Sequence, residues 1–240
     1  MKKGYPFLLK CTIIAYMQRK INFSIDEYYH IYNRGTDKRT TFMEPHDYNR
    51  FIALLYVCNS TEPVNISDHF KKGLTFLEIF ELERVDTLVE IGAYCLMPNH
   101  FHLLVREKTE GGISKFMLKL LTGYTIYFNK KNSRTGSLFE STFKAKHIDT
   151  DEYLKYLFAY IHLNPVKIID SGWKENGISN RIVAKEYLSK YMYSSYQEYL
   201  GVLRKEWKIL NRPAFPEYFI DPHDFEGFIE YWMKFKEEEL

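Results

Sequence analysis

The run YCLMPNHFHLLV, residues 94–105, constrains the fold of this chain more than any other segment. A proline within it is compatible with a β-strand only at an edge or a turn. The run therefore predicts one strand over residues 87–96 and a second over residues 101–106, with a turn between them. Because side chains alternate between the two faces of a strand, His100 and His102 should share a face.

The histidine pair has the spacing of a candidate metal site. At the normal rise of a strand, the Cα atoms of His100 and His102 lie about 6.6 Å apart, so both rings can reach one ion. Imidazole nitrogens bind zinc, copper, iron and nickel, and they also bind harder ions when oxygen ligands complete the site. An isolated His-x-His is more often a polar surface feature or core filling. Whether this pair binds a metal ion must therefore be judged from the rest of the sequence.

The other periodic segments define the fold class. Alternating aromatic residues predict a strand over residues 27–32, and helical spacing predicts a helix over residues 45–59. A second amphipathic stretch, with helical spacing, covers residues 113–129. Residues 143–148 are the fourth strand candidate, and a helix is predicted after them over residues 151–164. This β-α-β-β-α-β order, followed by a helix, indicates an α+β protein with a ferredoxin-like (RRM-like) split βαβ arrangement. We expect a four-stranded antiparallel sheet with helices on one face.

Composition restricts the class of protein further. The 240 residues are 45% apolar, so the chain can bury a substantial core, and 17% are aromatic, which suits either that core or the stacking of unpaired bases. The formal net charge is only +2, so local basic clusters must carry any contact with nucleic acid. Cys11, Cys58 and Cys95 lack C-x-x-C spacing, which favours a reducing, intracellular setting. The apolar stretch 5–16 is too short and too interrupted to span a bilayer.

The last predicted helix carries a polar stripe. Thr150 is its candidate N-cap, and it should end at Asn164, because the residue before a proline is pushed out of the α region. Tyr156, Tyr160 and Asn164 are each four residues apart, so they share one face. Such a stripe is either a functional surface or an amphipathic core with tyrosine hydroxyls at its rim.

Several motifs together resemble a known family. MPNHFHLLV at residues 97–105 and YIHLNPV at residues 160–166 are similar to motifs of the Y1 single-strand DNA transposases of the HUH superfamily. More narrowly, the chain resembles the IS200-like, REP-associated tyrosine transposases. YHIYNRG at residues 29–35, RTGSLF at residues 134–139 and SSYQEYL at residues 194–200 support this resemblance.

The resemblance implies specific roles for four residues. His100, His102 and Asn164 would be ligands of a divalent ion, Mg²⁺ or Mn²⁺, and Tyr160 would be the nucleophile. It implies a metal-dependent endonuclease and strand transferase that cleaves single-stranded DNA through a 5′-phosphotyrosine bond. The DNA partner would contain a hairpin of the REP type.

Candidate phosphate contacts are the basic residues near these motifs, although a solvated charged surface is the more common explanation for each of them. They are Arg34, Lys130, Lys131, Arg134, Lys144 and Lys146. We expect an N-terminal extension over residues 1–24, a catalytic domain over residues 25–165, and a C-terminal extension over residues 166–240. The aromatic run 191–199 makes that extension a candidate DNA-recognition segment. The expected location is cytoplasmic and nucleoid-associated, without a membrane, as a monomer or a homodimer.

Two other classes of protein compete with this interpretation. A non-catalytic protein could grip structured nucleic acid through aromatic side chains and basic loops. That class would need neither the histidine pair nor Tyr160 and Asn164, so their joint presence favours an enzyme. A structural metalloprotein is the third class, but closed structural sites usually have four ligands, often thiolates.

Overall fold

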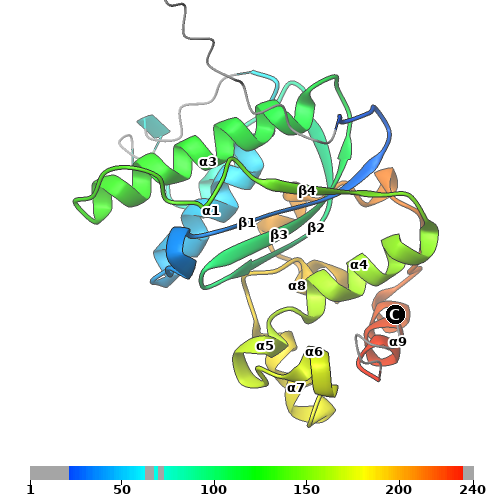
Figure 1. Cartoon of the computed structure of the whole chain (residues 1–240). Coiled ribbons are helices and arrows are strands. Elements are labelled where there is room, and N and C mark those ends of the chain that lie inside the picture. Colours follow the sequence, from blue (N-terminus) through cyan, green and yellow to red (C-terminus); the bar gives the residue numbers. More distant parts are fainter. Residues whose placement is uncertain (1–21, 63–67, 70–72, 235–240) are drawn as a thin grey trace, which may run out of the picture.

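A four-stranded antiparallel sheet lies at the centre of the molecule in a computed structural model, which describes residues 22–62, 68–69 and 73–234 (Figure 1). The spatial order β2-β3-β1-β4, together with the chain order β1-α1-β2-β3-α3-β4-α4, confirms the predicted ferredoxin-like α+β fold. The strands are β1 (Tyr28–Arg34), β2 (Val89–Met97), β3 (His100–Glu107) and β4 (Lys144–Ile148). Most of the N-terminal extension expected over residues 1–24 lies outside the described residues.

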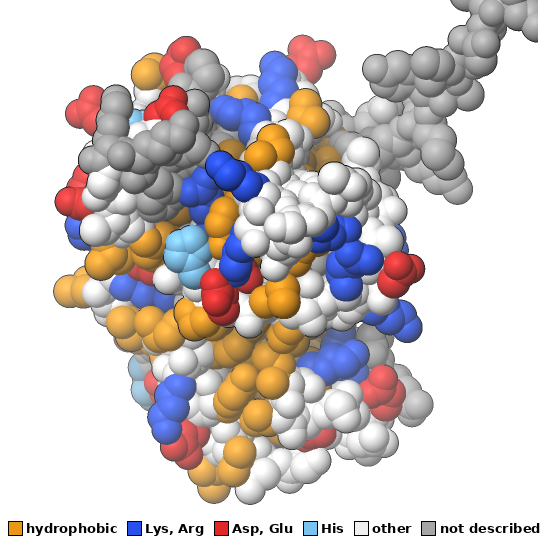
Figure 2. Space-filling view, turned by 90° about the vertical axis from the view of Figure 1, so that its left-hand side faces the viewer, with side chains coloured by type: hydrophobic (Ala, Val, Ile, Leu, Met, Phe, Trp, Pro, Cys, Tyr) orange, Lys and Arg blue, Asp and Glu red, His pale blue; other side chains and the backbone are white. Residues whose placement is uncertain are grey.

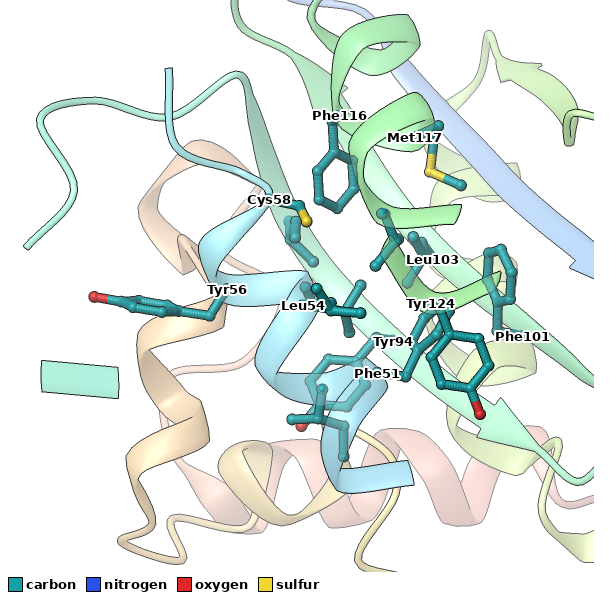
Figure 3. Close-up of a cluster of buried hydrophobic side chains, with 14 of the residues drawn as sticks. Phe51, Leu54, Tyr56, Cys58, Tyr94, Phe101, Leu103, Phe116, Met117 and Tyr124 are labelled. Atoms are coloured by element: carbon teal, nitrogen blue, oxygen red, sulfur yellow. The ribbon is translucent and has the colours of Figure 1, made fainter. Parts of the chain in front are cut away.

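The two crossover helices cover one face of the sheet. They are α1 (Pro45–Val57) and α3 (Gly112–Lys131). A capping box between Glu44 and Asp47, with a proline in the first turn, sets the start of α1. Figure 3 shows apolar side chains from α1, α3 and the sheet meeting in one cluster. Its members include Phe51, Leu54, Phe101, Leu103, Phe116, Met117 and Tyr124.

The opposite face of the sheet is also covered, so the prediction of helices on one face only was wrong (Figure 1). Helix α4 (Asp151–Leu163) packs there, and the chain after it forms a second buried cluster with the sheet. The sequence after Pro165 has short, weakly periodic segments, which is why helical spacing did not predict this layer. Its helices are α5 (Val166–Ile169), α6 (Trp173–Asn176), α7 (Arg181–Lys190), α8 (Tyr196–Tyr199) and α9 (Pro222–Trp232).

The shorter 3₁₀ helices link these elements. They are η1 (Thr36–Lys38), η2 (Leu77–Glu81), η3 (Lys205–Ile209) and η4 (Arg212–Ala214).

The pleat of β3 divides its side chains between the two clusters. Phe101 and Leu103 belong to the cluster under α1 and α3, whereas Leu104 belongs to the cluster under α4. His100 and His102 therefore point to the α4 face, on a strand with neighbours on both sides. This confirms the predicted placement of the histidine pair on a central strand facing α4.

The aromatic run 191–199 packs into the protein core. Tyr191, Tyr196 and Tyr199 are buried. Tyr191 donates a hydrogen bond to the carbonyl of Leu96, and Tyr199 donates one to the carbonyl of Gly92, both on β2. In this conformation these three rings are not available to stack on bases, and a role of this run in DNA recognition stays a prediction.

The surface carries both signs of charge. Figure 2 shows basic, acidic and apolar side chains interspersed on one face, without a single-sign patch among the described residues. This agrees with the small net charge of +2. Among the helices that the structure describes, none combines the length and the apolar character that a membrane crossing requires.

A buried hydrogen-bond network fixes α4 against β2. His162 is fully buried, and its ring contacts the carbonyl of Phe158 through Nδ1 (2.8 Å) and the hydroxyl of Ser195 through Nε2 (2.8 Å). The Ser195 hydroxyl also accepts a hydrogen bond from the backbone N–H of Tyr94 (3.0 Å). His162 is therefore structural.

We expect Ser195→Ala to lower the free energy of unfolding by about 1–3 kcal/mol, because it leaves buried polar atoms of His162 and Tyr94 without a partner. Urea denaturation measures the change. Ser189→Ala is the matched control, because Ser189 is exposed and its hydroxyl bonds only to the carbonyl of Glu186 among the contacts described. An equal decrease in the free energy of unfolding in Ser195→Ala and Ser189→Ala would contradict the assigned role of Ser195.

Candidate active site

The four residues singled out by the motifs converge between β3 and α4. The ring centroids of His100 and His102 are 5.1 Å apart, and those of His102 and Tyr160 are 5.3 Å apart. Both pairs are nearly perpendicular, at 88° and 85°. Asn164 caps the C-terminus of α4, one turn beyond Tyr160. Strand pairing and helix packing thus bring His102 and Tyr160, which are 58 positions apart in the sequence, into contact.

Each histidine of the pair uses Nδ1 in a hydrogen bond. Nδ1 of His100 donates to the side-chain oxygen of Asn99 at 2.6 Å. Nδ1 of His102 lies 2.8 Å from Nε2 of His30, a residue of β1. Ligating histidines in metal sites typically donate their other ring N–H to such a partner, which sets the tautomer. This arrangement leaves Nε2 of both rings as the candidate ligand atoms.

Asn164 is held in position by the last turn of α4. The residue is almost fully buried, and its side-chain nitrogen donates to the carbonyl of Tyr160 at 3.0 Å. Its side chain also lies close enough to His100 to raise the pKa of that ring, against the larger lowering effect of burial. With the nitrogen engaged by Tyr160, the amide oxygen is the atom that is free to serve as a ligand beside His100.

The backbone explains why Asn164 stays on this face. Its φ of −50° and ψ of −40° are helical, although α4 ends at Leu163 and Pro165 follows. The expectation that the proline pushes Asn164 out of the α region was therefore wrong. The retained helical geometry keeps Asn164 on the same face as Tyr160.

The site holds its histidines in the neutral state. Burial lowers the pKa of His30 to about 3, with help from the charges of Lys146 and Lys174. Burial and the nearby Arg34 lower the pKa of His100 to about 4. Burial also places the pKa of His102 well below its usual value. Neutral imidazole is the form that binds a metal ion, so the rings are ready for ligation without losing a proton.

The donor set fits a divalent ion with open coordination positions. Two imidazole nitrogens and one amide oxygen would supply three ligands, which is the pattern of a catalytic rather than a closed structural site.

Two other groups of candidate ligands lie among the described residues, around His46 and around His223. Both have a simpler explanation. Asp47 belongs to the capping box of α1, and Asp221 accepts the N-cap hydrogen bond of α9.

A groove of about 730 Å³ opens beside the candidate nucleophile. One wall is the face of the sheet formed by β3, β1 and β4, and the other is formed by α4 and the end of α9. Aromatic rings and a few polar groups line it: His30, Tyr32, His102, Lys146, Thr150, Glu152, Tyr153, Tyr156, Leu157, Tyr160 and Trp232. The ring centroid of Tyr156 lies 5.7 Å from the ring centroid of Tyr160 and 5.7 Å from that of Trp232. The aromatic wall of the groove is therefore continuous.

Three residues of the site were not predicted from the sequence. His30 supports His102, Lys174 donates a hydrogen bond to the Tyr160 hydroxyl at 2.8 Å, and Trp232 lines the groove. His30 alone had a signal: it alternates with Tyr32 on the first strand, but the register opposite β3 was needed to place it. Lys174 and Trp232 come from the irregular segment after Pro165, where no motif marks them.

The six basic candidates for DNA contacts divide into two sets. Arg34 pairs with His100 in the sheet, and Lys144 and Lys146 are opposite Tyr32 and His30, so these three lie on the α4 face. The other three, Lys130, Lys131 and Arg134, lie at the far end of α3 and in the loop after it. Lys131 is paired with Glu44 and Asp47, and Arg134 with Asn129. The structure brings only the first set close to the candidate active site.

Comparisons with known proteins complete the description. The family model described as "Transposase IS200 like" matches residues 66–164, the segment that holds His100, His102, Tyr160 and Asn164. The comparison with curated proteins found no similar sequence. A solved structure described as a REP-associated tyrosine transposase bound to a REP hairpin is 13% identical, covers 79% of this chain and 90% of its own, and has a TM-score of 0.46.

The family match confirms the resemblance that the motifs indicated and supports a transposase-like function on DNA. Residues 66–164 are thus similar to the IS200-like transposases, and this segment contains all four residues that the motifs singled out.

Proposed function

We propose that this protein is a metal-dependent endonuclease and strand transferase that acts on single-stranded DNA containing a REP-like hairpin. One observation carries the proposal: the Tyr160 ring lies 5.3 Å from the His102 ring, while Asn164, one turn later on α4, lies close enough to His100 to influence its pKa. A nucleophile and three candidate ligands thus share one buried corner. A protein that only binds nucleic acid has no need of this arrangement.

Tyr160 is the proposed nucleophile. Its phenolic oxygen forms a bond to phosphorus, and the bond from phosphorus to the 3′ oxygen breaks. The phenol gives up its proton, and the 3′ oxygen leaves as a hydroxyl after taking one up. The resulting 5′-phosphotyrosine ester conserves the energy of the phosphodiester bond, so a new 3′-hydroxyl can be joined without ATP.

His100, His102 and Asn164 are the proposed ligands of the ion, Mg²⁺ or Mn²⁺. When bound, a divalent ion supplies Lewis-acid polarisation of a phosphate oxygen and fixes its position. His30 and Asn99 orient the two imidazoles through their Nδ1 atoms. His30 and Asn99 thereby hold the neutral ligand atoms of the two histidines in a fixed geometry before the reaction begins.

The groove beside Tyr160 is the proposed path of the single strand. Every base has a π-face, so aromatic rings such as Tyr156 and Trp232 hold unpaired bases without requiring one sequence. Lys146 lines the same groove and can pair with backbone phosphates. Arg34 and Lys144 add positive charge on the same face of the sheet.

The second candidate function is non-catalytic binding of structured nucleic acid. The aromatic groove alone would suffice for it, whereas the buried histidines and Tyr160 would then have no role. Covalent attachment of DNA distinguishes the two functions directly.

We expect Tyr160→Phe to abolish covalent attachment of labelled hairpin DNA in the presence of Mn²⁺. The change removes one oxygen and keeps the ring, so folding and DNA affinity should be retained, while loss of a nucleophile costs on the order of 10⁶ in rate in a serine-protease example. Tyr156→Phe is the matched control on the same helix and should still form the adduct. Denaturing gels and peptide mass spectrometry report the result. An adduct on Tyr156, or on Tyr160→Phe, would refute the assignment.

His102→Ala should weaken Mn²⁺ binding by more than about 10-fold and should abolish cleavage. A loss of about 10-fold is already typical when a residue that only supports a metal ligand is removed. Hairpin binding should change little, because base and phosphate contacts lie elsewhere. Isothermal titration with Mn²⁺ measures the first effect. His223→Ala removes a histidine from an exposed acidic group and should leave Mn²⁺ affinity unchanged. Weakened Mn²⁺ binding in His223→Ala, with unchanged binding in His102→Ala, would place the ion outside the proposed site.

Trp232→Ala should weaken binding of single-stranded DNA by about 1–3 kcal/mol, the value of one base stacked on an aromatic ring. Trp207→Ala is the control, because Trp207 is also partly exposed but lies on η3, outside the groove. Fluorescence anisotropy with a labelled strand gives both affinities. Equal affinities for the wild type and Trp232→Ala would remove α9 from the proposed DNA path.

A further inference from the structure

We propose that Lys174 is a catalytic residue of this site, whose ammonium group stabilises the negative charge on the phenolic oxygen of Tyr160. The charge develops as the Tyr160 hydroxyl loses its proton to solvent for the attack on phosphorus, and it returns when the tyrosine leaves during strand joining. This inference rests on the proposed function, because it assigns a role in the same reaction.

The geometry places Lys174 on the reacting atom. Its Nζ donates a hydrogen bond to the Tyr160 hydroxyl at 2.8 Å and lies 4.1 Å from the centre of the same ring. Hydrogen bonds in which one partner is ionised are about twice as strong as neutral ones, and they strengthen as the acceptor gains negative charge. The bond is therefore worth more in the transition state than in the resting enzyme, which is the condition for acceleration.

Among the described residues, Lys174 has no carboxylate partner. Within the described part of the chain, no acidic side chain lies within ion-pair distance of its Nζ. Lys155 of α4, by contrast, is paired with Asp151 at 2.6 Å, and Lys185 is paired with Glu226 and Glu230. The ammonium of Lys174 is half-buried and has the Tyr160 hydroxyl as its hydrogen-bond acceptor. An unneutralised charge in this position is costly unless an anionic group forms beside it.

The local structure fixes Lys174 by anchoring its neighbour. Trp173 is buried in the cluster under α4, so the first residue of α6 is immobilised and the next one is directed at Tyr160. Asp170 accepts hydrogen bonds from the backbone and the hydroxyl of Ser179, which closes the loop that contains α6. Preorganised donors of this kind require no rearrangement when the charge develops.

Lys174 stabilises the phenolic oxygen and does not remove its proton. A protonated amine donates to the hydroxyl, so it cannot accept that proton. Its influence extends over the site, because its positive charge contributes to the lowered pKa of His30, His100 and His102. The rings described in contact with Tyr160 are those of His30, His102 and Tyr156. Among the contacts described, Lys174 is the cation that touches the Tyr160 oxygen.

Lys174 lies outside the segment that matches the IS200-like family model, which ends at residue 164. The segment after Pro165 therefore completes the active site from the same chain. In this protein the matched domain alone does not contain every group in contact with the nucleophile.

Single-turnover kinetics on the full-length protein test the inference. Lys174→Met keeps the length of the side chain and removes its charge, and we expect the rate of adduct formation to fall about 100-fold, the lower range for losing one preorganised donor. The affinity for uncleaved DNA should stay within about threefold. Lys174→Arg should recover most of the rate, and strand joining from the isolated adduct should slow by a similar factor. Lys155→Met is the control and should react at the wild-type rate.

The outcomes separate this inference from the proposed function. Wild-type protein that forms no adduct overturns both. If the wild type forms the adduct and Lys174→Met forms it at the same rate, only the role of Lys174 is overturned. Weakened DNA binding at an unchanged single-turnover rate would make Lys174 a phosphate contact instead. Thermal denaturation verifies folding, and Lys174→Gln replaces the methionine variant if that variant does not fold.

Discussion

The pleat of β3 is the constraint on which the candidate active site depends. The sheet is buried on both faces, so each side chain of β3 enters one of two different environments. Phe101 and Leu103 secure the strand in the apolar cluster under α1 and α3, while His100 and His102 are forced into the other layer. A shift of one residue in register would exchange the two sets and bury the imidazoles among apolar side chains. The apolar residues on one face therefore set the position of the polar residues on the other.

Burial of polar rings requires that each of them has a partner, and this requirement organises the site. His30 and Asn99 satisfy Nδ1 of His102 and His100, respectively. Burial also disfavours the charged imidazole, and the cations around the site act in the same direction. The same surroundings that suppress protonation of the histidines favour an anion, such as a phosphate or a phenolate, at the mouth of the site.

The sequence allowed accurate prediction where the evidence was local. Strand parity predicted that His100 and His102 share a face, and helical spacing placed Tyr160 and Asn164 on one side of α4. The order of periodic segments predicted the sheet, because four strands and two crossover helices have few ways to pair. His30 could not be assigned, because its role depends on the register between β1 and β3. Lys174 could not be assigned either, because its contact depends on packing of a segment that has no strong periodicity.

The position of the candidate nucleophile depends on the chain that follows it. One side of α4 packs on the sheet through residues such as Leu157, and another side contacts the C-terminal layer, where Phe158 lies 5.8 Å from Phe219 between ring centroids. Ser195 fixes the same helix through His162. A helix that is apolar on two sides is stable only when both are covered. The C-terminal segment thus contributes both the packing that orients Tyr160 and, through α6, the cation that contacts its oxygen.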